Sequence, residues 1–198
     1  MRSIRIMLQK IAVSSVALMV SASFLIPSIV SADNSTLILY YSRTNKTGIV
    51  AEELKAQIPN ARLVEIKSDI GIMKAVLWHQ LFNRNACNEP IAVDLYKYDT
   101  IILCSPVWLQ KISSPMRTVI NTVPLQGKQV KIFAVCAGHF GESGQEKLIK
   151  LVASKGTNLT GLAVIKSGGK TDEEIRKQTR EQLNNPAPLP SIANNAAQ

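Results

Sequence analysis

The sequence has few of the residues that build metal centres. Only two histidines, His79 and His139, and three cysteines, Cys87, Cys104 and Cys136, occur among 198 residues. Their spacing matches no usual metal-binding pattern, so we expect no metal site. Cys104 and Cys136 fall in apolar runs, where a free thiol packs like a small apolar side chain. A disulfide or a redox pair is the alternative, although three is an odd number for such pairing.

The chain also lacks any block of lysine and arginine interleaved with aromatic residues. Its formal net charge is +9 at pH 7, but the basic residues are spread along the sequence. A basic surface favours acidic partners, anionic lipid or nucleic acid. Nucleic-acid binding usually needs a basic stripe or cluster, so we expect no nucleic-acid partner. Dispersed, solvated charge is the simpler interpretation.

Acidic residues are absent from the first 32 positions. Arg2, Arg5 and Lys10 form a basic start, no charge follows between positions 11 and 32, and Val30-Ser31-Ala32 supplies a small-residue cleavage site. The pattern predicts a signal peptide at 1–32, without the adjacent arginines of a twin-arginine signal. Left uncut, the uncharged run is long enough to be a membrane anchor. We therefore expect a periplasmic or secreted protein, or a membrane-anchored one with its domain outside the cytoplasm.

Removing residues 1–32 leaves 166 of the 198 residues and lowers the net charge from +9 to +6, because the segment carries three basic residues and no acid. That length suits one domain, which we place at 33–183. From 184 to 198, Pro, Asn and Ala replace any periodic pattern, and we predict a disordered tail.

Short apolar runs alternate with helical patterns through this domain, which indicates βαβ units and a parallel sheet. Three of the runs are almost continuously apolar, as expected for strands covered by helices on both faces. The sequence thus predicts a doubly wound α/β fold with five strands and five helices. The predicted strands are 36–41, 62–66, 100–104, 130–136 and 159–166.

Four of the helices are predicted from apolar residues at helical spacing, and the fifth, at 172–183, is mostly charged. The third helix is expected to have Ser114 as N-cap and Pro115 at its first position. The four apolar stripes are Val50, Leu54 and Ile58; Met73, Val76, Leu77 and Leu81; Met116, Val119, Ile120 and Val123; and Leu148, Leu151 and Val152.

The turn after the first strand is rich in hydroxyl groups and opens a helix near Lys46. A phosphate at a helix N-terminus gathers unpaired amides and is favoured by the helix dipole. Asn45 tolerates a left-handed backbone, which would turn successive amides inward as an anion nest. Simple helix capping is the alternative. The residues of this predicted phosphate site are Ser42, Arg43, Thr44, Asn45, Lys46 and Thr47.

Two later turns are expected at the same edge of the sheet. Ser105-Pro106-Val107-Trp108 follows the third strand, and a rigid proline before a large aromatic ring can wall a planar ligand. Packing of Trp108 on a neighbouring helix is the alternative. The turn from Gly138 to Gly144 follows the fourth strand. Its glycines allow backbone to approach a ligand closely, and its members include His139, Phe140 and Gly141.

Three motifs in order resemble the flavodoxin family. They are Tyr-Ser-x-Thr-x-x-Thr from Tyr41, Tyr-Asp-x-Ile-Ile-x-x-Ser-Pro-Val-Trp from Tyr98, and Gly-Lys-x-Val-x-x-Phe-Ala-x-Cys-x-Gly from Gly127. The resemblance covers nearly all of 36–166. It implies a five-stranded sheet of order 2-1-3-4-5 that binds FMN. Ser42 to Thr47 would then hold the phosphate, Ser105 to Trp108 would line the isoalloxazine, and Gly138 to Gly144 would form the third edge.

The chain departs from the family in two respects. The phosphate loop commonly reads Thr-Gly-Asn-Thr, whereas Thr44-Asn45-Lys46-Thr47 stands here, and many flavodoxins are acidic whereas this chain is basic. The resemblance implies a redox protein that either carries electrons to a partner protein or uses NAD(P)H to reduce a quinone- or flavin-type acceptor. His139 is a candidate catalytic residue in the second case. The alternative is an exported binding or scaffold module that has lost FMN. A membrane partner is expected only if the leader stays uncut.

Overall fold

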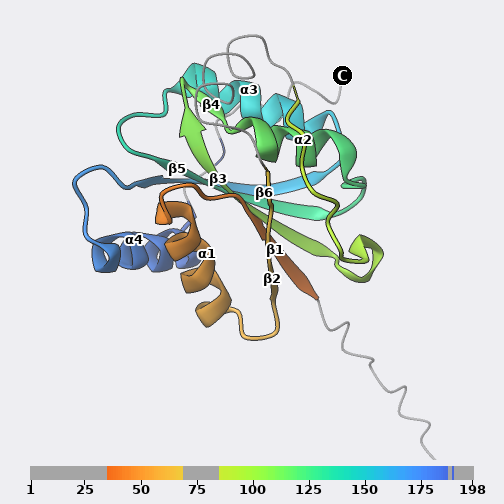
Figure 1. Ribbon diagram of the computed structural model, residues 1–198, viewed down its shortest axis with the longest axis horizontal. Helices are drawn as coiled ribbons and strands as arrows, with labels where there is room; N and C mark the ends of the chain where they lie inside the picture. The colour runs from red at the N-terminus through yellow and green to blue at the C-terminus, as the bar shows by residue number, and fades with distance from the viewer. Residues whose placement is uncertain (1–34, 69–84, 187–188, 190–198) are drawn as a thin grey trace, which may run out of the picture. The chain divides into compact units, whose positions relative to one another are not determined.

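The computed structural model describes residues 35–68, 85–186 and 189 (Figure 1). The predicted signal peptide or anchor at 1–32 lies outside these residues. So does the predicted second helix, with Met73, Val76, Leu77 and Leu81.

A parallel sheet forms the centre of the domain and confirms the predicted fold class (Figure 1). Its parallel strands lie in the order β2-β1-β3-β5-β6, which is 2-1-3-4-5 when these five are counted along the chain. A sixth, two-residue strand, β4, pairs antiparallel with β3 and was not predicted. The strands are β1 (Thr36–Tyr40), β2 (Arg62–Glu65), β3 (Thr100–Trp108), β4 (Lys111–Ile112), β5 (Gln129–Cys136) and β6 (Asn158–Lys166).

The predicted end of the third strand at Cys104 is wrong. β3 continues through Ser105, Pro106, Val107 and Trp108, so these residues are strand rather than turn. Pairing explains the extension: β5 runs beside β3 as far as Pro106, and β4 pairs with its last two residues. Pro106 has no amide proton to leave unsatisfied, and its carbonyl accepts a hydrogen bond from the Ser113 amide at 2.9 Å.

Helices cover both faces of the sheet. α1 and α4 lie on one face, and α2 and α3 lie on the other (Figure 1). The N-cap of α2 is Ser113 rather than the predicted Ser114, which is the first helical residue. α4 begins with a capping box in which Thr171 and Glu174 satisfy each other's backbone amides. The helices are α1 (Lys46–Gln57), α2 (Ser114–Thr122), α3 (Glu142–Ala153) and α4 (Asp172–Asn184), with a short 3₁₀ helix, η2 (Leu95–Lys97).

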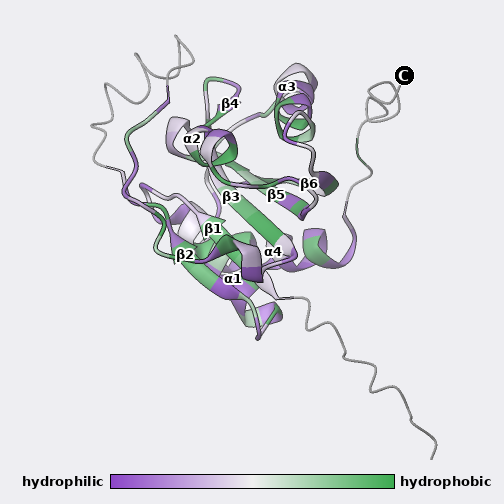
Figure 2. Ribbon diagram, turned by 90° about the vertical axis from the view of Figure 1, so that its right-hand side faces the viewer, coloured by the Kyte–Doolittle hydropathy of each residue, from purple (hydrophilic) through white to green (hydrophobic). Residues whose placement is uncertain are grey.

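Alternation along the strands divides the core into two clusters. Leu37 and Leu39 point to the α2/α3 face, whereas Ile38 points to the α1/α4 face. The strands are predominantly hydrophobic between the helices, as β3 illustrates in Figure 2. Cys104 and Cys136 are free and buried, which confirms their predicted packing role. Burial raises the pKa of both thiols, although the charge of Lys166 partly offsets this at Cys136.

Residues 184–186 and 189 of the predicted tail are described. α4 continues to Asn184, and Leu189 packs against the apolar cluster of the α2/α3 face. Among the helices of the described residues, none is both long and apolar enough to span a bilayer.

Candidate functional site

The loops that follow β1, β3, β5 and β6 meet at one edge of the sheet, because the carboxyl ends of parallel strands lie together. We call this the carboxyl edge. All three sequence-predicted site segments lie there: residues 42–47 after β1, residues 105–108 at the end of β3, and residues 138–144 after β5. The segment between β6 and α4 joins them and was not predicted.

The turn after β1 has the backbone conformation predicted for an anion nest. Asn45 is left-handed, with φ 61° and ψ −7°, and it is the N-cap of α1. The first helical hydrogen bond runs from the Ile49 amide to the Asn45 carbonyl at 3.0 Å. The amides of Lys46, Thr47 and Gly48 therefore precede the helical ladder, and among the described residues none of them has an acceptor. No acidic residue occupies this first turn.

Gly48 is required by the shape of this turn. A Cβ at position 48 would lie 2.3 Å from the Asn45 side-chain oxygen, far inside contact distance. Only glycine lets the Asn45 side chain lie across the first turn of α1. The sequence analysis did not single out Gly48, because no local pattern reports this contact.

The side chains of the turn differ in how open they are. Thr44 and Asn45 are exposed, Ser42 is half-buried, and Thr47 is only 2% exposed. Lys46 is directed away to α4: its Nζ lies 2.8 Å from Asp172 Oδ1 and 3.4 Å from the Lys170 carbonyl. The groups that this turn offers to an anion are therefore backbone amides and hydroxyls, because the Lys46 charge is already paired.

Tyr41 connects the first turn to the end of β3. Its amide donates to the Cys104 carbonyl at 3.1 Å, and its ring meets that of Trp108 nearly edge-on, with centroids 5.9 Å apart. Burial raises the pKa of Tyr41, while the charge and a hydrogen bond of the exposed Arg43 side chain lower it. Trp108 is thus held at the carboxyl edge, half-buried, and Arg43 interacts with Tyr41.

Ser105 has a structural partner. It is fully buried, and its Oγ lies 3.0 Å from Ser113 Oγ, at the N-cap of α2. The Ser113 amide also donates to Ser105 Oγ at 3.3 Å. Pro106, Val107 and Trp108 are half-buried, so the part of this segment that faces the carboxyl edge begins after Ser105.

A strained hairpin tip joins β3 to β4. Leu109 and Gln110 both have positive φ angles, 49° and 59°, as in a two-residue type I′ turn. Such turns usually contain Asn-Gly, so a Leu-Gln pair costs backbone strain. The Gln110 side chain closes this strained tip onto the loop after β5. Its amide nitrogen donates to the His139 carbonyl at 2.8 Å, and its oxygen accepts from the Gly141 amide at 2.7 Å.

The loop after β5 presents backbone rather than large side chains. Gly138 is exposed, and a Cβ placed there would meet nothing within 4 Å. At Gly144 a Cβ would lie 2.6 Å from both the Gln110 carbonyl and the Phe140 ring. Phe140 itself is 2% exposed and belongs to the α2/α3 core, so its ring is not offered to a ligand. His139 is exposed at the carboxyl edge.

The segment between β6 and α4 completes the edge. Ser167 bonds the Cys136 carbonyl through both its amide, at 2.8 Å, and its hydroxyl, at 3.2 Å. A Cβ at Gly168 would lie 1.9 Å from the Ala137 carbonyl oxygen, so backbone passes backbone there. No local sequence pattern predicts this contact or the Gln110 clamp, by which we mean the two hydrogen bonds from Gln110 to His139 and Gly141, because both join residues far apart along the chain.

Comparison with known proteins supports the fold. No family model and no curated protein matches this sequence. Among solved structures, a flavoprotein from Lactobacillus acidophilus, crystallised in complex with FMN, is 25% identical, with a TM-score of 0.59, covering 74% of this chain and 99% of its own.

Two candidate flavoproteins from Bacteroides show the same architecture. The one from Bacteroides eggerthii is 21% identical with a TM-score of 0.58 and covers 74% of this chain and 96% of its own. The one from Bacteroides uniformis is 19% identical with a TM-score of 0.59 and covers 74% and 98%. The order of the parallel strands, the two helical layers and these structures together give one result: the chain has the flavodoxin-like α/β fold.

Proposed function

We propose that the carboxyl edge binds FMN and that the protein is a redox flavoprotein. The observation that carries this proposal is the turn after β1, where left-handed Asn45 precedes three amides that have no acceptor among the described residues. A phosphate is the ligand that such a helix N-terminus suits best. The likeness to the Lactobacillus acidophilus flavoprotein, crystallised with FMN, supports the same ligand.

The residues present fit the parts of this cofactor. The amides of 46–48 and the hydroxyls of Ser42, Thr44 and Thr47 would hold the phosphate, with no carboxylate in the turn to oppose it. Trp108, fixed by Tyr41, would pack on the flat ring system. The exposed backbone of Gly138, beside clamped Gly141, leaves room for close approach to a ring edge.

When bound, FMN supplies the redox chemistry, and the chain binds and orients it. Arg43 interacts with Tyr41 and adds positive charge to the edge. Lys46 acts indirectly, because its bond to Asp172 ties the start of α1 to α4. The Gln110 clamp fixes the loop after β5 against the hairpin tip, so that the ring and phosphate subsites keep one spacing.

A protein or a small-molecule acceptor would exchange electrons at the exposed edge, and His139 is the candidate for contacting such a substrate. The proposed location outside the cytoplasm is supported by the sequence of residues 1–32 alone.

The test is a titration of the purified protein with FMN, followed by flavin fluorescence. Thr47→Ala should weaken binding about 10- to 100-fold, as expected for loss of a hydrogen bond to a charged group. Trp108→Ala should weaken it about 3- to 10-fold, as expected for loss of ring packing. Thr160→Ala and Tyr96→Ala are matched controls, because both lie toward the opposite, amino end of the strands.

Three outcomes discriminate between the candidate functions. Bound FMN that is bleached rapidly by NAD(P)H without oxygen would indicate a reductase. Bound FMN that NAD(P)H does not reduce would indicate an electron carrier. Absence of binding at micromolar FMN, or equal affinity in Thr47→Ala, Trp108→Ala and both controls, would refute the site and leave the cofactor-free binding module.

A further inference from the structure

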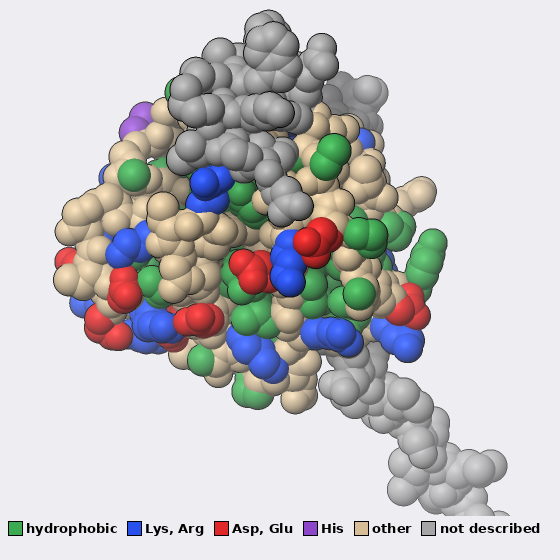
Figure 3. Space-filling model, in the orientation of Figure 1, with side chains coloured by type: hydrophobic (Ala, Val, Ile, Leu, Met, Phe, Trp, Pro, Cys, Tyr) green, Lys and Arg blue, Asp and Glu red, His purple; other side chains and the backbone are tan. Residues whose placement is uncertain are grey.

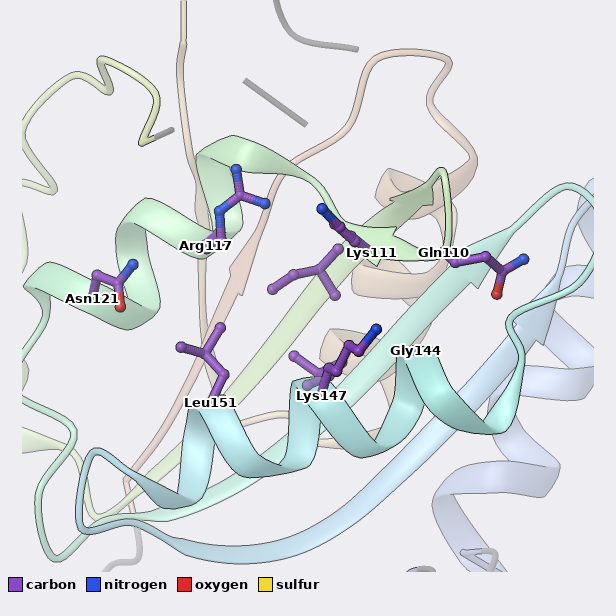
Figure 4. Close-up of a pocket in the computed structure, with 9 residues that line it drawn as sticks. Gln110, Lys111, Arg117, Asn121, Gly144, Lys147 and Leu151 are labelled. Atoms are coloured by element: carbon purple, nitrogen blue, oxygen red, sulfur yellow. The ribbon is translucent and has the colours of Figure 1, made fainter. Parts of the chain in front are cut away.

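A cavity lies on the α2/α3 face, away from the turn after β1 (Figure 4). It has a volume of about 500 Å³, within the range of small-molecule sites. Its walls come from three elements: β4, α2 and α3. The lining residues are Gln110, Lys111, Ile112, Arg117, Asn121, Gly144, Lys147, Leu148 and Leu151.

Helical spacing explains how these residues come together. Gly144, Lys147, Leu148 and Leu151 follow i, i+3, i+4 and i+7 on α3, so one face of this helix lines the cavity. Arg117 and the residue one turn later, Asn121, face it from α2, and Lys111 and Ile112 face it from β4. Because Gly144 has no side chain, the tip of the hairpin approaches α3 closely and closes one end.

The floor of the cavity is apolar. Ile112 and Leu148 are each 4% exposed and belong to the core cluster of this face, and half-buried Leu151 packs against the same cluster. These three side chains form an apolar surface that water solvates poorly. An apolar chain or ring lying on them would therefore gain free energy from leaving water.

The polar part of the lining carries one sign of charge. Lys111, Arg117 and Lys147 come from three different elements and surround the apolar floor, as Figure 4 shows with Leu151. The other polar residues lining it are Gln110 and Asn121, and no described lining residue is acidic. Cationic residues around one cavity favour an anionic ligand over a neutral or cationic one.

Burial strengthens the case at Arg117. The residue is 8% exposed, and burial lowers the pKa of its guanidinium. Arginine nevertheless stays charged in proteins. Its guanidinium also matches the planar geometry of a carboxylate.

We propose that this cavity binds a small organic anion with an apolar body, such as a medium-chain carboxylate. The anionic group lies among Lys111, Arg117 and Lys147, and the apolar part covers Ile112, Leu148 and Leu151. This site is distinct from the turn after β1, because no residue of 42–48 is among the described residues that line the cavity. The proposal does not depend on FMN, and its test is made without FMN.

The test is isothermal titration calorimetry of the full chain with octanoate, compared with octanol and octylamine. Octanoate should bind saturably at one site, and the neutral and cationic analogues should bind at least about tenfold more weakly. Lys147→Glu should weaken octanoate binding about tenfold or more. Lys150→Glu is the matched control: it makes the same exposed charge reversal one turn further along α3, outside the lining.

Each other result overturns the proposal. Equal binding of octanol or octylamine would show that the cationic rim confers no selectivity. Equal loss in Lys147→Glu and Lys150→Glu would show that the site lies elsewhere. Absence of octanoate binding to a chain that circular dichroism shows to be folded would leave the cavity without this ligand class.

Discussion

The two faces of the sheet are covered by similar helical layers but balance their charges differently. On the α1/α4 face, acidic side chains of α1 pair with arginines of α4, and both signs of charge are interspersed on the surface in Figure 3. On the α2/α3 face, three cations surround an apolar cavity. Opposite charges therefore pair where α1 packs on α4, whereas the charged residues that line the cavity beside α2 and α3 are all cationic.

Glu53 lies at the centre of the ion pairs between α1 and α4. Its side chain is 7% exposed and lies 3.5 Å from Arg176, 3.2 Å from Arg180 and 2.9 Å from Gln57. Burial alone raises the pKa of Glu53, but hydrogen bonds from Gln57 and Arg180 and the Arg180 charge bring it below its ordinary value. Glu53 therefore joins α1 to both arginines of α4, each of which has a second carboxylate partner, Glu52 for Arg176 and Glu173 for Arg180.

Leucine-to-alanine substitutions on the two faces should give the largest contrast. Leu54→Ala, at a fully buried position on α1, should lower the free energy of unfolding by about 3 to 4 kcal/mol, because it creates a new cavity. Leu148→Ala should cost only about 1 to 2 kcal/mol, because one side of this side chain already borders a cavity. Urea denaturation of both variants measures the difference. Equal losses of stability would show that Leu54 and Leu148 are packed equally tightly.

A glycine substitution should disturb the contact between α3 and the β3–β4 hairpin, which lies between the cavity and the carboxyl edge. Gly144→Ala places a Cβ 2.6 Å from the Gln110 carbonyl, so the hairpin must shift, at a cost of about 2 kcal/mol. Gly138→Ala is the control, because open space surrounds it, and its stability should change by less than about 0.5 kcal/mol. Thermal unfolding of both proteins checks this. A neutral Gly144→Ala would mean that the hairpin is not held against α3.

Neutralising Glu53 should lower the free energy of unfolding by a smaller amount, and this loss should depend on pH. Glu53→Gln should lower the free energy of unfolding by about 1 kcal/mol at pH 7, because two half-exposed arginines lose their shared charge partner. A lowered folded-state pKa gives stability above the unfolded pKa of about 4.5, and this stability is lost as the pH falls through the lowered value. Urea titrations of wild type and variant should therefore converge below about pH 4.

The more exposed pair Asp94–Lys97 provides the control for that experiment, since its atoms are 3.8 Å apart. Asp94→Asn should change stability by no more than about 0.5 kcal/mol. If the Glu53→Gln difference persisted unchanged at acid pH, the ion network would not be its cause.

The smallest effect is expected at Lys46. Its pair with Asp172 is partly solvent-exposed, so Lys46→Gln should cost about 0.5 kcal/mol or less. Because the ammonium is directed to α4, the same change should weaken FMN binding less than Thr47→Ala does. Denaturation and flavin fluorescence measure the two effects. A larger loss of FMN affinity in Lys46→Gln would show that this lysine contacts the ligand.

Local sequence patterns were enough to predict the parallel strands and the left-handed turn at Asn45. Apolar runs predicted every parallel strand, and the tolerance of Asn for left-handed backbone predicted the Asn45 conformation found at the start of α1. Both features depend on residues within a few positions of each other.

Features that depend on distant contacts were missed. Ser105-Pro106 is a turn signal, yet pairing with β5 and β4 keeps it in a strand. The hairpin tip at Leu109–Gln110 has no Asn-Gly signature, so neither β4 nor the Gln110 clamp was predicted. Phe140, predicted at a ligand edge, instead fills the core because α3 places Gly144 beneath its ring.

The central claim, that FMN binds at the carboxyl edge through the turn after β1, is tested most directly by amide NMR of the ¹⁵N-labelled protein titrated with FMN. The account predicts that the largest shifts fall on the amides of Lys46, Thr47 and Gly48 and on the indole of Trp108, while Lys147 and Leu151 of the cavity change little. Shifts confined to the cavity, or none at saturating FMN, would contradict it.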